Sequence, residues 1–548
     1  MRGHYSDIWQ AVARAFPDRP AVVTPEEVLT YDRLVTEAGA LAGHLRTQGV
    51  EPGDSVAIFS YNRPEYVVAL FACFACGFAP VPMNFRYRPA ELRPLLEDAE
   101  VRTLIHPRSL RDVVHEAVDG LRLPLVEIDD TGDGPVPTAD LPDTTPWDKA
   151  TSGEAPLPAT PPAGGELRLF TGGTTGRPRA VVWDAADILD VQMYSIYGTA
   201  GLPMPATLDE AVAVAADPAT PATVSLPLAP LMHGTALFTS MNTLALGGSI
   251  LMLPSPRLDS EAAARFAVDA GATRIVVAGD AIALPLVEAV ESLGLVPFGR
   301  VASIISSGMR LSPQVKRRVH DVGDIAITDL LASTEGGPYA VNVTRSADDL
   351  PGELRLLPGA VVLDEERNDV AHLEGGRGIL GFRGTLPKGY FHDEQKTREA
   401  FPLIRGVRHV VPGDWAVARG DGTVELLGRG SAVVNTGGEK VYPAEVEQAL
   451  LDHPLIVDAV VFGMPDARYG EVVTAVVATP DGEPVDDGEL RAHLDARLAG
   501  YKRPRNVVFR STLDRSPHGK VDLARLKAAV APQIDPSIAP TGTMRVTK

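Results

Sequence analysis

Short apolar segments alternate with amphipathic segments of helical length, and this alternation restricts how the chain folds more than any other feature. Residues 56–59, 101–106, 274–280 and 301–307 are such apolar segments, whereas residues 64–78 form one of the predicted helices. The later apolar segments end in small or polar residues, where α/β sheets place their ligands. The alternation therefore predicts a layered α/β protein.

Length and charge set limits on the partners. With 548 residues, the chain is long enough for three or four units of ordinary domain size. Hydrophobic residues make up 45% and charged residues 22%, which is typical of a globular protein. The formal net charge of −20 argues against nucleic acid and acidic membrane surfaces, because no concentrated basic stretch offsets it. We therefore expect local groups to bind any anionic ligand.

The cysteines and the most apolar segment indicate a cytoplasmic protein without integral membrane contact. Only Cys73 and Cys76 occur, so no disulfide framework exists, and their apolar neighbours favour core packing over a redox or metal site. Residues 66–79 are too short for the roughly 20 residues that cross a bilayer. The first 20 residues lack the apolar region of a secretory signal.

Two composition changes suggest domain limits. Residues 128–165 are rich in Asp, Pro, Thr and Gly, which predicts a surface excursion or linker rather than a core element. The segment from about residue 431 to residue 527 has its own predicted strands and helices, which predicts a separate small domain. The chain after Val530 is rich in Pro and Thr, and we expect this tail to fray.

The segment Leu169–Val182, LFTGGTTGRPRAVV, predicts a strand, a turn and a second strand. Its glycines let the backbone approach an anion, its threonines add hydroxyl donors, and Arg177 and Arg179 add positive charge. The spacing is not that of the Walker A motif, because no Gly-Lys-Ser/Thr follows. A phosphate-binding loop and a solvated hairpin turn are both consistent with this segment alone.

Four further clusters carry chemistry, although each is also consistent with a surface turn or a solvated charge. In residues 329–337, a hydroxyl and then a carboxylate follow a predicted strand, and the pair suits a phosphate and Mg²⁺. Asp414 and Arg429 offer a carboxylate for sugar hydroxyls and a guanidinium for an anion. A second glycine turn spans residues 437–440, and a single lysine, Lys520, follows Gly519 near the C-terminus.

In this order, the clusters resemble those of the AMP-forming adenylate ligases, which include acyl-CoA synthetases, adenylation domains of peptide synthetases, and luciferases. The resemblance extends from residue 29 to residue 520. The sequences TGGTTG at residue 171, GTLPKGY at 384, GRGS at 428, NTGGEKV at 435 and AGYKRPR at 499 are similar to those of actinobacterial fatty-acid and sterol-side-chain CoA ligases. The resemblance implies a large N-terminal domain of layered sheets and helices, residues 1–428, a hinge at 429–431, a small mobile α+β domain at 432–530, and a flexible tail at 531–548.

The resemblance also implies roles for individual residues. The implied catalytic residues are Lys520, which would bridge the substrate oxyanion and the α-phosphate, Thr334 at the α-phosphate, Glu335 at Mg²⁺, and His233 as a gate of the acyl pocket. The implied nucleotide and CoA residues are Thr171, Gly172, Gly173, Thr174, Thr175, Gly176 and Arg179 at the β- and γ-phosphates, Asp329 before the Thr-Glu pair, Asp414 and Arg429 at the ribose, and Gly437, Gly438 and Lys440 at the thiol channel. Ser431 would be the hinge.

Three positions depart from the family pattern. Arg179 stands where the family usually has lysine, and Leu331-Ala332 replaces an aromatic-glycine pair that contacts adenine. The segment 307–311 replaces a turn beside the adenine and acyl pocket and contains Arg310. This arginine is consistent with a surface position or with a negatively charged or very small acid.

We therefore expect an ATP- and Mg²⁺-dependent ligase that forms an acyl-adenylate and transfers the acyl group to CoA. One alternative keeps the adenylation step but activates nitrite and diazotises an aromatic amine, as related diazotases do. Another is a non-catalytic nucleotide sensor, against which the retained Glu335 and Lys520 argue. The identity of the acid and the oligomeric state, with a homodimer as one candidate, remain open.

Overall fold

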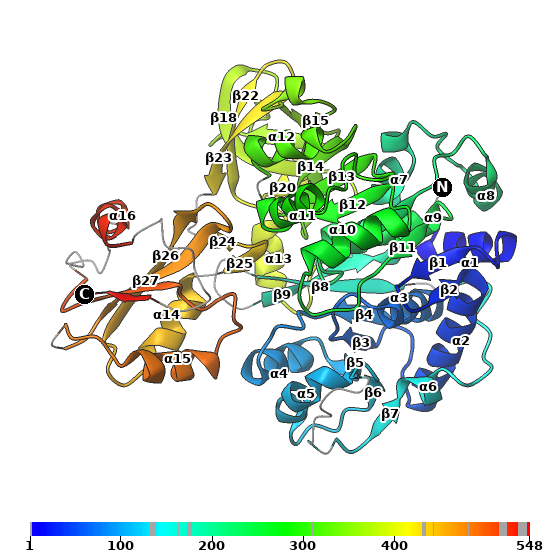
Figure 1. The fold of residues 1–548 in the computed structure, drawn as a ribbon, viewed down its shortest axis with the longest axis horizontal. Helices are drawn as coiled ribbons and strands as arrows, with labels where there is room; N and C mark the ends of the chain where they lie inside the picture. Colours follow the sequence, from blue (N-terminus) through cyan, green and yellow to red (C-terminus); the bar gives the residue numbers. More distant parts are fainter. Residues whose placement is uncertain are drawn as a thin grey trace.

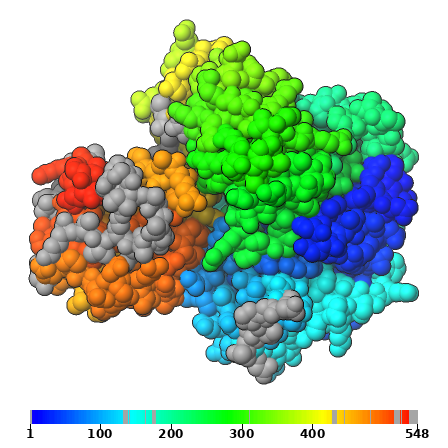
Figure 2. Space-filling model, in the orientation of Figure 1, coloured from blue at the N-terminus to red at the C-terminus, as the bar shows by residue number. Residues whose placement is uncertain are grey.

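The computed structural model describes residues 3–131, 139, 141–162, 164–172, 178–309, 311–429, 434–441, 443–480, 482–513, 523–534 and 545–547. Figure 1 shows a large N-terminal part, in blue to yellow, and a smaller C-terminal part, in orange and red, beside it. The predicted α/β fold class is confirmed. Figure 2 shows the orange C-terminal part in contact with the N-terminal part.

A parallel sheet of five strands lies in the N-terminal part, in the order β4-β3-β5-β6-β7. Its strands are β3 (Ser55–Ile58), β4 (Ala79–Pro82), β5 (Val101–Pro107), β6 (Leu125–Ile128) and β7 (Thr144–Pro146). The helices around it are α2 (Tyr31–Thr47), α3 (Pro64–Cys76), α4 (Pro89–Asp98), α5 (Arg111–Val118) and α6 (Trp147–Ala150). Strand β7 pairs with β6 at the edge of the sheet and has no buried residue, so part of the 128–165 stretch forms a strand at the surface.

Helix α3 shows why the most apolar segment is a core helix. Pro64 stands in its first turn, and Gly77 ends it with a left-handed φ of 74°. All its residues except Glu65 are buried, including Cys73 and Cys76. Burial raises the pKa of both thiols. The predicted core packing of the cysteines is confirmed.

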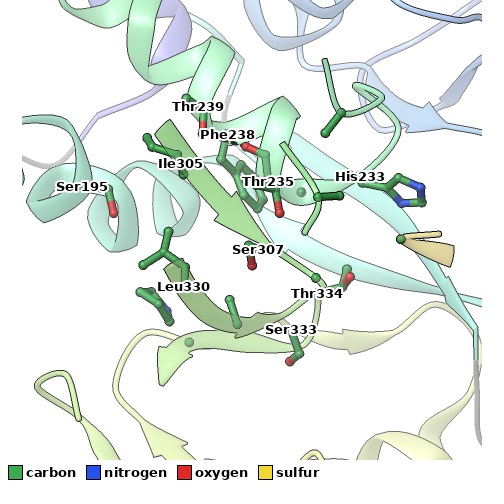
Figure 3. Close-up of a pocket in the computed structure, with 18 of the residues that line it drawn as sticks. Ser195, His233, Thr235, Phe238, Thr239, Ile305, Ser307, Leu330, Ser333 and Thr334 are labelled. Atoms are coloured by element: carbon green, nitrogen blue, oxygen red, sulfur yellow. Dashed lines mark hydrogen bonds between the residues drawn. The ribbon is translucent and has the colours of Figure 1, made fainter. Parts of the chain in front are cut away.

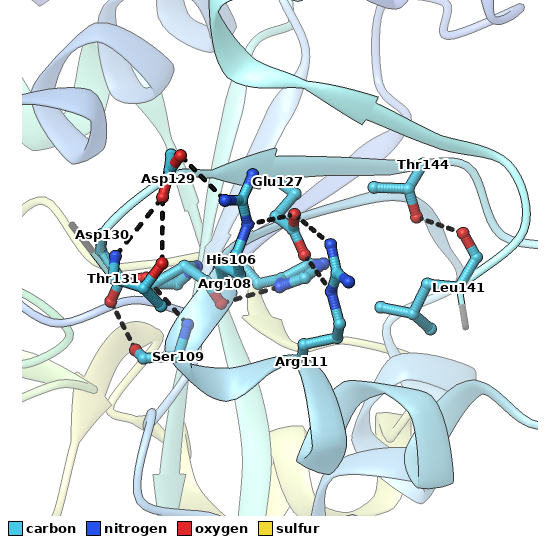
Figure 4. Close-up of polar contacts among 11 residues, drawn as sticks. His106, Arg108, Ser109, Arg111, Glu127, Asp129, Asp130, Thr131, Leu141 and Thr144 are labelled. Atoms are coloured by element: carbon cyan, nitrogen blue, oxygen red, sulfur yellow. Dashed lines mark hydrogen bonds and ion pairs between the residues drawn. The ribbon is translucent and has the colours of Figure 1, made fainter. Parts of the chain in front are cut away.

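The polar ends of β5 and β6 meet in a group of ion pairs (Figure 4). Glu127 accepts hydrogen bonds from Arg111, at 2.6 and 2.7 Å, and from Arg108 at 3.0 Å. Arg108 also contacts Asp129 at 2.8 Å. The two guanidinium groups hold the pKa of Glu127 below its ordinary value even though burial opposes this shift. This group fixes the loops at the carboxyl edge of the sheet.

A larger sheet forms the centre of the N-terminal part and has 15 strands among the described residues. Strands β1 (Pro20–Val23), β11 (Ser249–Leu251), β10 (Val224–Pro227), β12 (Arg274–Val277), β13 (Ser303–Ser307) and β14 (Ala326–Ser333) are parallel neighbours, with β2 (Val28–Thr30) antiparallel at the edge. The rest of the sheet is antiparallel: β15 (Gly336–Thr344), β16 (Leu354–Leu356), β23 (Thr423–Arg429), β22 (Asp414–Arg419), β18 (Glu374–Arg383), β17 (Ala360–Leu363), β21 (Val407–Val410) and β20 (Leu403–Ile404).

Helices cover both faces of the parallel strands. The helices are α1 (Tyr5–Ala15), α7 (Ala185–Ile196), α8 (Leu208–Ala216), α9 (Gly234–Ala245), α10 (Ser260–Asp269), α11 (Asp280–Ser292) and α12 (Pro313–Asp321), with α13 (Glu394–Ala400) further along the chain. Alternate strand residues face α10–α12, where Ile275, Ile304 and Ile327 join one apolar cluster. The residues between them face the opposite side.

Two smaller sheets complete the fold. Strands β8 (Glu166–Gly172), β9 (Pro178–Asp184) and β19 (Gly389–Tyr390) form an antiparallel sheet. The C-terminal sheet contains β24 (Val434–Thr436), β25 (Glu439–Val441), β26 (Asp458–Asp466), β27 (Gly470–Ala478), β28 (Asn506–Arg510) and β29 (Arg545–Thr547), with helices α14 (Pro443–Leu451), α15 (Asp487–Asp495) and α16 (Leu523–Val530). The predicted hinge at 429–431 begins at Arg429, the last residue of β23, and its boundaries stay a prediction.

Candidate active site

A cavity of about 620 Å³ lies between the central sheet, helices α7 and α9, and the C-terminal part. Figure 3 shows Thr235, Phe238 and Thr239 of α9 on one side and Ile305, Ser307 and Leu330 of the strands on the other. The lining strand residues alternate: Ser303, Ile305 and Ser307 in β13, and Ala326, Thr328, Leu330 and Ala332 in β14. The cavity therefore occupies the sheet face opposite α10–α12.

The strands beside the predicted phosphate loop reach this cavity. Strands β8 and β9 form the predicted hairpin, in which Gly172 pairs with Pro178. Thr171 and Pro178 line the cavity, and Thr171 is buried. Arg179 donates a hydrogen bond from Nε to Oδ2 of Asp393 at 2.8 Å, so an acidic group already contacts this guanidinium.

Thr334 of the Thr-Glu pair also lies at the cavity, whereas Glu335 is not among the residues that line it. The carbonyl oxygen of Thr334 accepts a hydrogen bond from Trp183 Nε1 at 2.9 Å. The neighbouring Glu335 is half-buried, and its Oε1 accepts a hydrogen bond from the Tyr390 hydroxyl at 3.0 Å. The chain thus holds a hydroxyl and an oriented carboxylate within two consecutive residues.

The structure does not bring Asp329 to the cavity. Asp329 lies on the same face of β14 as Ile327, opposite the cavity residues Thr328 and Leu330, because side chains alternate along a strand. Its Oδ2 lies 3.2 Å from Nζ of the buried Lys316 in α12. Burial raises the pKa of Asp329 although Lys316 opposes this shift. The pair supports the packing of α12, so the predicted nucleotide contact has no support.

Asp414 and Arg429 face each other at the ends of two paired strands. They are partners in the register of β22 and β23. Asp414 is half-buried and is not among the residues that line the cavity. The side chain of Arg429 lies outside the described part of the structure, as do Gly173, Thr174, Thr175, Gly176, Arg310, Ser431 and Lys520. Their predicted roles stay predictions.

The predicted thiol-channel turn of the C-terminal part enters the cavity. Gly437 and Gly438 have left-handed φ values of 59° and 90° and connect β24 to β25. A Cβ atom on Gly438 would lie 3.3 Å from Cβ of Ala278 and 3.5 Å from Sδ of Met309. Gly438 and Lys440 line the cavity. Glycine therefore lets this turn approach the carboxyl ends of β12 and β13 closely.

Glu439, in the same turn, connects the two parts of the chain. Its Oε1 lies 3.3 Å from Nε2 of His233 and accepts a hydrogen bond from Arg86 at 2.5 Å. Burial disfavours the charged carboxylate, but His233, Arg86 and Lys502 outweigh it and lower the pKa of Glu439 to about 2. The predicted gate residue His233 thus contacts the turn that was predicted to form the thiol channel.

Lys502 forms a second connection beside the first. Its Nζ donates hydrogen bonds of 2.7 Å to Glu91 in α4 and to Glu445 in α14. Tyr501 accepts a hydrogen bond from Asn84 Nδ2 at 3.1 Å. Sequence analysis did not identify Asn84, Arg86, Glu91 or Glu445. Asn84, Arg86 and Glu91 follow β4 in a stretch that is typical of many surface loops, and Glu445 is an acidic residue in the first turn of α14, so neither segment signals the contact.

The described carboxylates would need phosphate oxygens of a substrate to complete a Mg²⁺ site. Among the described residues, no group of three or more His, Cys, Asp or Glu side chains is arranged to hold a metal. Mg²⁺ is commonly held by one or two carboxylates together with substrate phosphates. Glu335, oriented by Tyr390, suits that role.

Among the residues that the structure describes, no helix is long and apolar enough to span a bilayer.

Comparison with protein families identifies this arrangement. The family described as AMP-binding enzyme matches residues 9–391, and its C-terminal domain matches residues 445–520. The chain belongs to the AMP-binding enzyme family. The predicted resemblance is thereby confirmed, and this AMP-binding enzyme is an AMP-forming acid ligase.

Two CoA ligases match this enzyme over nearly its whole length. A medium/long-chain-fatty-acid–CoA/3-oxocholest-4-en-26-oate–CoA ligase of Mycobacterium marinum is 34% identical over 94% of each chain. A 3-oxocholest-4-en-26-oate–CoA ligase of Rhodococcus rhodochrous is 35% identical over 95% of each chain. The amide bond synthetase McbA of Marinactinospora thermotolerans shares the fold, with a TM-score of 0.77 at 22% identity over 96% of this chain and 99% of its own. These relatives do not favour the diazotase alternative.

Proposed function

We propose that this AMP-binding enzyme uses ATP to convert a carboxylic acid to its acyl-adenylate, with release of pyrophosphate, and then transfers the acyl group to CoA. The proposal depends on the observation that residues 438–440 of the glycine turn line the same cavity as Thr334. The cavity is thus shared by Thr334, which is expected to bind the α-phosphate, and by the turn that is expected to admit the CoA thiol. Two sequential reactions at one intermediate require such an arrangement.

The acid is proposed to have a medium or long apolar skeleton. Apolar side chains that line the cavity include Ile188, Phe238, Ile305, Leu330 and Val341. Burial of an apolar chain against them is favourable by about 25 cal/mol per Å² of apolar surface removed from water. The fatty and sterol-derived acids named for the two ligase relatives support this substrate class.

The residue roles follow from this reaction. Thr171 and the glycine-threonine loop after it are proposed to hold the β- and γ-phosphates, and Thr334 the α-phosphate. Glu335 would hold Mg²⁺, which supplies positive charge at the leaving pyrophosphate. Lys520 is proposed to stabilise the developing negative charge during adenylation. Asp414 and Arg429 are proposed for the ribose.

The conformation described by the structure suits the second reaction. The turn 437–440 lies at the cavity and His233 contacts Glu439. We propose that residues 429–431 form the hinge about which the C-terminal domain moves to bring Lys520 to the site for the first reaction. We also propose a cytoplasmic location, where ATP and CoA are available. The homodimer stays a prediction.

Pyrophosphate release and acyl-CoA formation, measured separately, test the proposal. Wild-type enzyme is expected to release pyrophosphate with fatty or sterol-derived acids and ATP, and to form the thioester only when CoA is added. Lys520→Ala is expected to lose adenylate formation while ATP binding remains. Turnover that requires nitrite and an aminohydroxybenzoate instead of a carboxylic acid would overturn the proposal, as would unchanged pyrophosphate release by Lys520→Ala.

A further inference from the structure

The end of the cavity at the amino ends of the parallel strands carries two arginines. Arg274 in β12, Ser303 in β13 and Ala326 in β14 are partners in the parallel register and all line the cavity. Arg345 follows β15, directly after Thr344, which pairs with Ile327. It also lines the cavity. The four residues therefore form one row across the amino ends of the parallel strands.

This row lies far from the reaction end of the cavity. Ser303, Ile305 and Ser307 line the cavity along the whole of β13, and Ser307 lies at the end that Gly438 approaches. Four residues of extended chain correspond to about 13 Å at about 3.3 Å per residue. An acid whose carboxylate reacts near Thr334 would therefore place its opposite end at the arginine row.

Arg274 lacks a protein partner in this row. Its Nε atom is buried and has no hydrogen-bond partner, and no carboxylate of the described residues forms an ion pair with it. Burial lowers the pKa of the Arg274 guanidinium. A buried donor without a partner is unfavourable, and more so when it is charged. A negatively charged ligand group would remove both costs.

Arg345 adds a second positive charge at the more exposed side of the row. Its backbone N–H donates to Oδ2 of Asp349 at 2.6 Å, and Asp349 is the nearby carboxylate on its own segment. Its side chain forms no ion pair within the described part of the chain. Ser303 and Ala326, which lie between the two arginines, are small and leave room above the sheet.

We propose that Arg274, together with Arg345, forms a subsite for a second carboxylate at the far end of the acid, so that α,ω-dicarboxylic acids are preferred substrates. This inference rests on the proposed acid-activating function. A neutral oxygen, such as a ketone, would satisfy a hydrogen bond of Arg274 but would leave its charge unpaired. The apolar walls between the two ends suit the carbon chain that separates the carboxylates.

Three acids of matched length test the subsite: dodecanoate, dodecanedioate and the monomethyl ester of dodecanedioate. Wild-type kcat/KM for pyrophosphate release is expected to be about 10- to 100-fold higher with dodecanedioate, because a hydrogen bond to a charged group contributes about 1.5–3 kcal/mol. Arg274→Met is expected to remove this preference, so that the ratio of kcat/KM for dodecanedioate to kcat/KM for dodecanoate falls to about one, and Arg274→Lys is expected to restore part of the preference. Arg265→Met, at an exposed position of α10, is the matched control.

The outcomes separate the subsite from the proposed function. Equal turnover of dodecanoate and dodecanedioate by wild-type enzyme would overturn the subsite while leaving acid activation intact. Equal turnover of the diacid and its ester would overturn the carboxylate assignment in favour of a neutral acceptor. Absence of pyrophosphate with every acid would overturn the proposed function. In that case the rise in Tm caused by dodecanedioate, compared between wild type and Arg274→Met, still tests the subsite because it needs no turnover.

Discussion

The Lys502 ammonium donates a hydrogen bond of 2.7 Å to Glu91, which lies 411 residues earlier in the chain. It donates a second bond of 2.7 Å to Glu445 of its own domain, and its Nζ lies 5.0 Å from the centroid of the Tyr87 ring. Burial alone would lower the pKa of Lys502, but Tyr87 and the two carboxylates raise it. A charged lysine thus joins the two parts of the chain in a buried position.

Lys502→Met is expected to slow acyl transfer more than adenylation. The substitution leaves two carboxylates close together and unpaired, which disfavours the docked arrangement. We expect transfer from preformed adenylate to CoA to fall about 10- to 100-fold, in line with the loss of hydrogen bonds to charged groups. Single-turnover pyrophosphate release and acyl-CoA formation measure the two reactions. Lys149→Met, at an exposed position, is the control, and equal slowing of both reactions would contradict the expectation.

The ion pairs of Glu439 are expected to weaken only at strongly acidic pH. The folded-state pKa of about 2 lies below the ordinary 4.5, so the stabilisation is complete above pH 4.5 and is lost as the pH falls toward 2. The full effect is at most about 3 kcal/mol, at 1.36 kcal/mol per pKa unit. Urea unfolding of wild type and Glu439→Gln between pH 8 and pH 3 measures it.

The difference in unfolding free energy between these two proteins should be constant down to about pH 4.5 and then shrink. Glu261→Gln, at an exposed position of α10, controls for the loss of a negative charge. A difference that stays constant between pH 4.5 and pH 3 would show that Glu439 is not held ionised by its neighbours.

Gly438→Ala is expected to lower acyl transfer about tenfold. The new Cβ atom would lie 3.3 Å from Cβ of Ala278, so the turn would have to move away from the cavity. Gly406→Ala is a matched control because Gly406 has a similar φ of 79° but open space around the added atom. Both substitutions place an alanine in the left-handed conformation, which costs roughly 1–2 kcal/mol. The same loss of transfer in both variants would assign the effect to backbone strain rather than to the contact.

Glu335→Gln is expected to raise the Mg²⁺ concentration needed for half-maximal pyrophosphate release by about tenfold, because a neutral amide is a weaker ligand for a hard cation. Tyr390→Phe removes the hydrogen bond that orients Glu335 and should cause a smaller shift in the same direction. Pyrophosphate release at a series of Mg²⁺ concentrations measures both. A wild-type titration curve for Glu335→Gln would rule out its role at the metal.

Local sequence signals predicted the helices and strands better than they predicted the contacts between side chains. Pro64 and Gly77 bound helix α3 because each has a conformation that favours a helix end. The position of Asp329 could have been judged from strand parity, because Ile327 and Asp329 lie on one face of β14 and Thr328 on the other. The ion pairs of Lys502 with Glu91 and of Glu439 with Arg86 join residues hundreds of positions apart. No local pattern encodes such contacts, since they depend on how two domains dock.

The turn 437–440 gives the reaction chamber a wall that belongs to the second domain. If that domain rotates as proposed, the turn would leave the cavity with it, and the mixed anhydride would be exposed to water. The mixed anhydride would then be protected only if the C-terminal domain docks faster than water hydrolyses the anhydride. The ratio of free acid to thioester among the products would therefore measure how often hydrolysis precedes docking.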